Sequence, residues 1–184
     1  MSYSIDNAHT MVQFSVRHMM ISKVRGQFEK FTGTVNLDEA NPSNTTLEIQ
    51  VETASVNTRE GQRDGHLRSP DFFNSEAFPY MIFKSSRVEV LDAAHANLYG
   101  DLTIRDVTKP LKLEVEFTGK AKSPWGMTSL GFMASGKINR KDWGLTWNQA
   151  LETGGILVGE EIEIVIELEL VQQEQKQTEL IQQA

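Results

Sequence analysis

The side chains best suited to chemistry lie in one segment, residues 58–74. It contains Arg63, Asp64, His66 and Arg68, and it ends in two adjacent phenylalanines. An imidazole close to a carboxylate can transfer protons, and the planar fork of arginine suits a phosphate. The structural alternative is that Arg63 and Asp64 tie a short helix to neighbouring backbone, which we favour for Asp64.

The histidines and nearby carboxylates could be assembled into a metal site. However, His9, His18 and His66, with Asp6 and Asp64, fit no ligand spacing of a known metal motif. His9 and His18 also differ in parity along one expected strand, so they should point to opposite faces. We therefore expect hydrogen-bonded histidines near one end of the fold and no metal.

Several other classes of chemistry are disfavoured. The chain has no cysteine, which excludes disulfides, zinc–thiolate sites and a thiol nucleophile. It has no Gly-x-Ser-x-Gly between a strand and a helix, and no glycine-rich phosphate loop, so we expect no cofactor. The net charge of −7 argues against a nucleic-acid partner.

The elements that must position these side chains are strands, because apolar and polar residues alternate along most of the sequence. One apolar and one polar face is typical of antiparallel sheets. The last strand is clearest, since glutamates at 161, 163, 167 and 169 alternate with isoleucines and leucines. Eight strands are predicted, over residues 12–18, 24–37, 47–51, 80–90, 98–104, 111–117, 130–138 and 162–170.

Eight such strands can form a barrel or a sandwich. Long strands, and glycines at 26 and 33 interpreted as bends or a bulge, favour an all-β, eight-stranded antiparallel extended β-barrel with one short helical insertion. Residues 1–171 should form this single domain. The glutamine-rich residues 172–184 should be a frayed helix or disordered tail. Nine phenylalanines and three tryptophans could fill the interior or line a channel, and the sequence leaves both open.

The N-terminus is polar and has no apolar signal region. No run approaches the roughly 18 apolar residues that span a bilayer. We therefore expect no membrane span and a cytoplasmic location.

The sequence resembles the YceI-like family over residues 3 to about 171. The most specific shared element combines Thr58, Arg63-Asp64-Gly65-His66-Leu67 and Asp71-Phe72-Phe73. Arg105-Asp106 departs from the family, which often has glycine there. Further similar segments follow in family order at residues 6–18, 24–33, 78–79, 83–85, 100–108, 138–145 and 158–162.

This resemblance implies a lipocalin-like barrel with a long apolar channel. The channel would hold an isoprenoid lipid, such as a polyprenyl phosphate or an isoprenoid quinone, without catalysis, to sequester or carry it. The resemblance also implies a homodimer. Many family members carry a signal peptide, and because we find none in this sequence, the chain resembles the cytoplasmic branch of the family. Two alternatives stay open: a barrel-based enzyme for a small hydrophobic substrate, with His66 or Asp64 as acid–base, and a stress-related scavenger of apolar compounds.

Candidate ligand contacts lie on the predicted inner face and in the insertion. Arg63, His66 and Arg68 are the candidates for the lipid head group, unless Arg63 pairs with an acidic neighbour and only anchors the helix. The expected apolar contacts are Phe14, Val16, Phe28, Leu47, Ile49, Leu67, Phe72, Phe73, Phe83, Leu102, Leu113, Phe132, Trp143 and Ile164.

Overall fold

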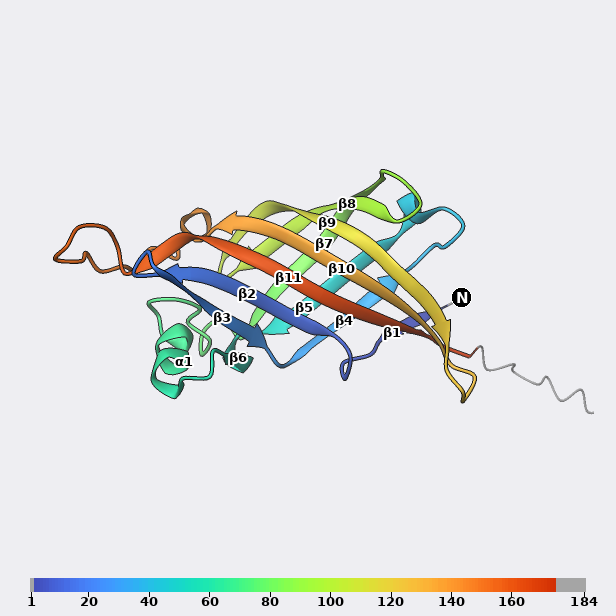
Figure 1. The fold of residues 1–184 in the computed structure, drawn as a ribbon, viewed down its shortest axis with the longest axis horizontal. Helices are drawn as coiled ribbons and strands as arrows, with labels where there is room; N and C mark the ends of the chain where they lie inside the picture. The colour runs from blue at the N-terminus through green and yellow to red at the C-terminus, as the bar shows by residue number, and fades with distance from the viewer. Residues whose placement is uncertain (1, 175–184) are drawn as a thin grey trace, which may run out of the picture.

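A computed structural model describes residues 2–174, which form one curled antiparallel sheet (Figure 1). The all-β fold and the short helical insertion are confirmed. One α-helix lies within the described residues, α1 (Gly61–Arg68), with three short 3₁₀ segments, η1 (Pro42–Asn44), η2 (Thr53–Ser55) and η3 (Arg140–Trp143). The strands are β1 (Tyr3–Ile5), β2 (Met11–His18), β3 (Ser22–Phe28), β4 (Phe31–Asn36), β5 (Thr46–Glu52), β6 (Val56–Asn57), β7 (Tyr80–Val90), β8 (His95–Ile104), β9 (Val107–Lys122), β10 (Thr128–Asn139) and β11 (Val158–Gln172).

The strand order explains how the sheet curls. Neighbouring strands run β4-β5-β7-β8-β9-β10-β11-β2-β3-β6, and β1 pairs separately with β11. The two ends of this path are β4 and β6. The chain runs directly from β3, the partner of β6, into β4, and from β5, the partner of β4, into β6, so the two ends lie close together. The sheet therefore wraps around an interior, consistent with the expected lipocalin-like fold.

The predicted count of eight strands is not confirmed, because the described residues form eleven. The expected strand over residues 24–37 breaks at Glu29 and Lys30 into β3 and β4. Both residues bond to the β5–β6 segment instead: Glu29 N donates to Ser55 O at 3.2 Å, and Lys30 O accepts from Glu52 N at 2.9 Å. The short strands β1 and β6 add the remaining two.

The glycine at position 26 does not mark the bend that we expected. Gly26 lies opposite Phe14 in the β2–β3 pair. A Cβ at this position would lie 2.5 Å from Phe14 Cζ, so only glycine leaves room for the ring. The bend comes three residues later, at Glu29.

Two apolar clusters occupy the interior. The larger includes Phe28, Phe83 and Leu113. The smaller, around Tyr3, Leu130 and Leu170, lies where β1 meets β11. The outer face carries ion pairs, such as Lys23 Nζ to Glu163 Oε2 at 3.1 Å and Lys137 Nζ to Glu161 Oε1 at 3.6 Å.

The strand β11 continues to Gln172, which pairs with Tyr3 of β1. Most of the predicted glutamine-rich tail, residues 175–184, lies outside the described residues. Among residues 2–174, no helix has the length and apolar character needed to cross a membrane.

Candidate ligand-binding cavity

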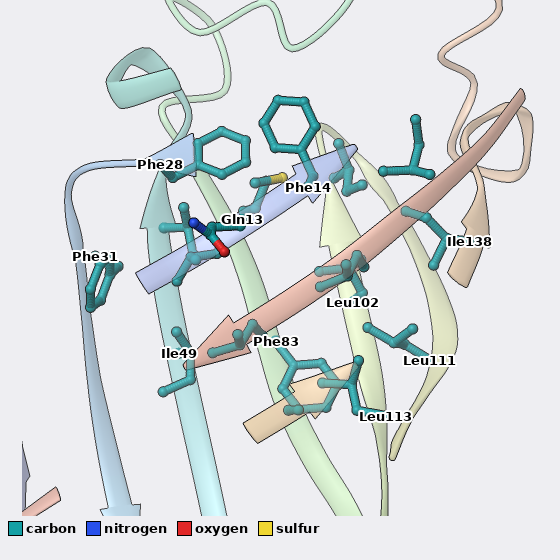
Figure 2. Close-up of a pocket in the computed structure, with 18 of the residues that line it drawn as sticks. Gln13, Phe14, Phe28, Phe31, Ile49, Phe83, Leu102, Leu111, Leu113 and Ile138 are labelled. Atoms are coloured by element: carbon teal, nitrogen blue, oxygen red, sulfur yellow. The ribbon is translucent and has the colours of Figure 1, made fainter. Parts of the chain in front are cut away.

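The inner face of the curled sheet surrounds a cavity of about 670 Å³ (Figure 2). Its wall is mostly apolar and is built from residues of many strands, which the alternating pattern turns inward. The volume falls within the range of small-molecule and cofactor sites. The structure thus decides between the two interiors that the sequence left open: this one is hollow.

Nearly all of the expected apolar contacts line this cavity, although whether they touch a ligand stays a prediction. Trp143 is the exception. It is almost fully buried, and its Nε1 donates to Leu102 O at 2.8 Å, which fixes it outside the lining. The expected residues in the lining are Phe14, Val16, Phe28, Leu47, Ile49, Leu67, Phe72, Phe73, Phe83, Leu102, Leu113, Phe132 and Ile164.

A row of aromatic rings joins the sheet to the 58–74 segment. The centroids of Phe14 and Phe28 are 5.5 Å apart, and those of Phe28 and Phe73 are also 5.5 Å apart. Phe73 is held in place by its backbone N–H, which donates to Leu67 O at 2.9 Å. The insertion therefore contributes to the cavity wall as well as covering it.

Polar side chains gather at one end of the cavity, which we call the polar end. It comprises Arg17 and His18 at the end of β2, and Glu60, Gln62, Arg63 and His66 in and before α1. These elements lie at the same end of the molecule (Figure 1). The other lining residues are predominantly apolar, so an amphiphilic ligand would place its head here.

Helix α1 is fixed by its own charged residues. Glu60 caps it by accepting from Gln62 N at 3.0 Å and Arg63 N at 2.7 Å. Asp64 is buried, and its Oδ1 accepts from Thr58 N at 2.9 Å and Thr58 Oγ1 at 2.5 Å. Arg63 donates to the same residue, from Nε to Thr58 Oγ1 at 2.7 Å and from Nη2 to Thr58 O at 2.8 Å. Asp64 therefore ties helix to backbone as favoured, and Thr58 stands between the arginine and the acid.

His66 lies in an aromatic cluster with Phe72 and Trp147. Its ring centroid is 5.1 Å from that of Phe72 and 4.6 Å from that of Trp147. Its Nε2 is 2.8 Å from Asp71 Oδ2. Trp147 also lines the cavity, and we did not predict it. A large aromatic residue in the non-alternating stretch before β11 was the available signal.

Of the head-group candidates, Arg63 and His66 line the cavity, whereas Arg68 lies outside its lining. Arg68 Nε donates to Ala54 O at 3.0 Å and so anchors α1 to η2. The three candidates are therefore not equivalent.

Arg140 is a lining residue that we also did not predict. It is 2% exposed and donates to Gly159 O, Leu145 O and Val158 O at 2.8, 2.6 and 3.3 Å. Burial lowers the pKa of Arg140 from its usual value, and the charge of Glu160 partly opposes this. Its guanidinium carbon lies 5.9 Å from the Phe72 ring centroid. A buried positive charge thus stands behind the aromatic cluster.

The histidines that the sequence offered for a metal are dispersed. His9 pairs with Asp6, Nδ1 to Oδ2 at 2.8 Å, and Glu169 lies close to both, while His18 and His66 belong to the polar end. The hydrogen bond that His9 donates to Asp6 raises the pKa of His9 and lowers that of Asp6. His9 is well exposed, and an ordinary ion pair accounts for the cluster.

Comparisons with known proteins agree on the nature of this chain. The profile of the YceI-like domain matches residues 3–170. A Staphylococcus aureus relative, UPF0312 protein SAS2572, is 35% identical over 162 residues, which cover 88% of this chain and 92% of the relative.

Solved structures have the same fold. The Campylobacter jejuni YCEI protein is 33% identical, with a TM-score of 0.74 over 86% of this chain and 90% of that one. Burkholderia cenocepacia BcnA, at 20% identity, has a TM-score of 0.79 over 90% and 98%. A polyisoprenoid binding domain from Saccharophagus degradans, at 13% identity, has a TM-score of 0.63 over 92% and 97%. The last two show similarity of fold alone.

Proposed function

Because this chain belongs to the YceI-like family, we propose that it binds an isoprenoid lipid in its cavity and sequesters or carries it without catalysis. The observation that carries the proposal is an apolar cavity of about 670 Å³ with polar side chains gathered at one end. The fold shared with a polyisoprenoid binding domain supports the same class of ligand.

Burial of the isoprenoid tail would supply most of the affinity. At ~25 cal/mol per Å² of apolar surface, two or three isoprene units contribute several kcal/mol. Such a tail needs no polar partner inside the wall. Its methyl branches would pack against rings such as Phe14, Phe28 and Phe73, which line the cavity.

The polar end gives the ligand a direction. A phosphate head would meet Arg63 and His66, with the buried charge of Arg140 behind the aromatic cluster. The tail would extend toward Phe132, which belongs to the apolar cluster at the β1–β11 end. A quinone would use the same path with a weaker preference for positive charge. Of these two head groups, we favour the phosphate.

The enzymatic alternative has little support in this geometry. The Oδ1 atom of Asp64 accepts two hydrogen bonds from Thr58, and the residue is 6% exposed. Of the two acid–base candidates, this leaves His66, which is paired with Asp71. Binding without chemistry is therefore the function that we propose.

Native mass spectrometry of freshly purified protein tests the proposal. We expect a retained mass in the range of a prenyl lipid, released on unfolding. An empty cavity that takes up neither prenyl phosphate nor quinone when these are added would contradict it. Retention of unrelated apolar compounds at equal affinity would support the scavenger instead. The same spectra count subunits, which tests the expected homodimer.

The head group is tested by comparing a prenyl phosphate with an uncharged quinone of similar chain length. His66→Gln should weaken the phosphate ligand about tenfold and leave the quinone unchanged, because a hydrogen bond to a charged group contributes about 1.5–3 kcal/mol. Arg68→Gln is the matched control, since Arg68 lies outside the lining. Arg63→Gln is interpreted only alongside its melting temperature, because Arg63 also holds Thr58. Equal binding of both ligands by all three variants would show that the segment is only a lid.

The cytoplasmic location expected from the sequence stays a proposal. Fractionation of the source cells with an antibody to this chain would decide it.

A further inference from the structure

The turn between β2 and β3 presents apolar side chains to solvent. Met19, Met20 and Ile21 are 42%, 60% and 81% exposed. Contiguous apolar residues at a protruding turn are unlike the scattered single ones of an ordinary surface. Figure 1 places this turn at the same end of the molecule as α1, and therefore beside the polar end of the cavity.

The turn holds these residues at a cost in backbone energy. Met19 and Met20 have φ values of 53° and 63°, in the left-handed region. For a residue with a side chain this region costs about 1–2 kcal/mol, and asparagine or glycine would adopt it more easily. The Met20 sulfur lies over Gly155, and Met19 N donates to Leu157 O at 2.8 Å, so the turn packs against the loop that precedes β11, and this loop extends beyond the turn (Figure 1). Folding gains little from the exposed side chains, which indicates that something outside the chain uses them.

The charges of the hairpin that carries the turn indicate what that partner is. Residues 7–28 contain no aspartate or glutamate, although the chain has a net charge of −7. They contain Arg17, Lys23 and Arg25, all exposed, of which Lys23 pairs with Glu163. On the neighbouring strand β11, Glu160 and Glu161 are paired with Lys141 and Lys137, and Glu152 lies in the preceding loop that contacts Met20. An apolar tip flanked by basic side chains fits the interface of an anionic bilayer, where the tip enters the acyl boundary and the cations meet lipid phosphates.

We propose that Met19, Met20 and Ile21 form a docking tip that inserts into the surface of an anionic lipid bilayer and holds the polar end of the cavity against it. Arg17, His18 and Val24 of the same hairpin line the cavity, so its entrance would face the lipid. An isoprenoid could then pass between bilayer and cavity with little exposure to water. The transfer of an isoprenoid rests on the proposed function, whereas the insertion of the docking tip into a bilayer does not.

A second copy of this chain is a poorer fit to the tip. A stable protein interface buries about 800 Å² on each partner, with some 20–30 residues on each side. Three residues on a turn fall far short of that. A bilayer needs no such area, because a few inserted side chains and nearby cations suffice for reversible binding.

Flotation with vesicles tests the inference, using phosphatidylcholine alone and an equal mixture with phosphatidylglycerol. The full chain should bind the mixed vesicles, less at high salt. Ile21→Ser should lower that partitioning about tenfold, from the loss of one inserted apolar side chain. Arg25→Gln should lower it about fivefold on mixed vesicles. Leu91→Ser is the matched control, because Leu91 is 57% exposed but lies beyond β7, away from the tip.

Equal vesicle binding by Ile21→Ser and Leu91→Ser, with unchanged melting temperatures, would overturn the inference. So would a dimer in solution that Ile21→Ser dissociates, since the tip would then be a subunit contact. Retained isoprenoid without vesicle binding overturns the docking tip alone. Vesicle binding by a chain with an empty cavity supports the tip and counts against the proposed function.

Discussion

Thr58 connects the two charged side chains that the sequence placed side by side. Its hydroxyl accepts from Arg63 Nε and donates to Asp64 Oδ1, and its own N–H also reaches Asp64. Without that hydroxyl, a buried carboxylate and a partly buried guanidinium would each lose a partner. The position of α1 over the cavity therefore depends on a residue that carries no charge.

Thr58→Val should lower the free energy of unfolding by about 1–3 kcal/mol, the usual cost of leaving buried polar groups unpaired. Thr58→Ser keeps the hydroxyl and is the control, expected within about 1 kcal/mol of the parent. Urea denaturation measures both. A valine variant as stable as the serine variant would mean that water replaces the hydroxyl.

Tyr3 should titrate unusually late. It is 8% exposed and donates to Glu39, and burial, followed by this hydrogen bond, raises the pKa of Tyr3 to about 12 from 10.0. The fold thus favours the neutral phenol. The stabilisation is fully present below pH 10.0 and is lost as the pH rises toward about 12. Ultraviolet titration should show one of the three tyrosines ionising last, and Tyr3→Phe should remove that step.

Single residues outside the alternating pattern were the hardest to predict. Arg140 and Trp147 line the cavity from the stretch between β10 and β11, where no period assigns a face. Arg68 is the opposite case, because this basic residue lies in the expected segment but donates to Ala54 O and is outside the cavity lining. The type of a side chain indicates its chemistry, whereas its direction depends on backbone that only tertiary contacts fix.

At the scale of elements, β11 shows how far alternation reaches. Ile162, Ile164 and Ile166 face the cavity, and Glu161 and Glu167 are exposed, as the pattern predicts. The break after Phe28 was not predictable, because it arises from hydrogen bonds of Glu29 and Lys30 to a distant segment. The role of Gly26 was missed for the same reason, because it is the ring of Phe14 on the neighbouring strand that leaves room only for glycine at this position.

The register of β11 can be tested with an inner and an outer substitution. Ile164→Asn should cost about 2–4 kcal/mol, from lost burial and an unpaired amide beside Phe14 and Gly136. Glu167→Gln is the control on the outer face, expected within about 0.5 kcal/mol. Thermal or urea unfolding measures both. A loss below about 0.5 kcal/mol for Ile164→Asn would place the strand in the inverted register.

For the whole molecule, the sequence predicted the fold class but left filled and hollow interiors equally open. The same phenylalanines could fill the interior or line a cavity, and the difference lies in how far the sheet curls.

The substitution Phe132→Trp tests whether a ligand occupies the hollow interior. Phe132 lines the cavity near the β1–β11 end, so a larger ring should reduce lipid retention more than it reduces stability. Native mass spectrometry and melting temperature give the two readouts, and unchanged retention would exclude a ligand that reaches this position.

Removal of residues 175–184 should leave both fold and binding intact. The strand pairing of β11 ends at Gln172, and Gln173 N still donates to Ser2 O at 2.8 Å. A melting temperature within about 2 °C of the parent is expected, as for a change that removes less than 1 kcal/mol. A large fall would show that the last ten residues contact the domain or a second subunit.

The position of β11 also has a consequence for biosynthesis. This strand is the last along the described part of the chain, yet it lies between β10 and β2 in the sheet and also holds β1. Until the ribosome releases it, β2 and β10 have unpaired edges and the cavity has no wall along that side. Contacts between the first and last strands are slow to form, and open edges invite association with other chains. We therefore expect the nascent domain to need protection until β11 has been synthesised, and lipid to enter only the complete sheet.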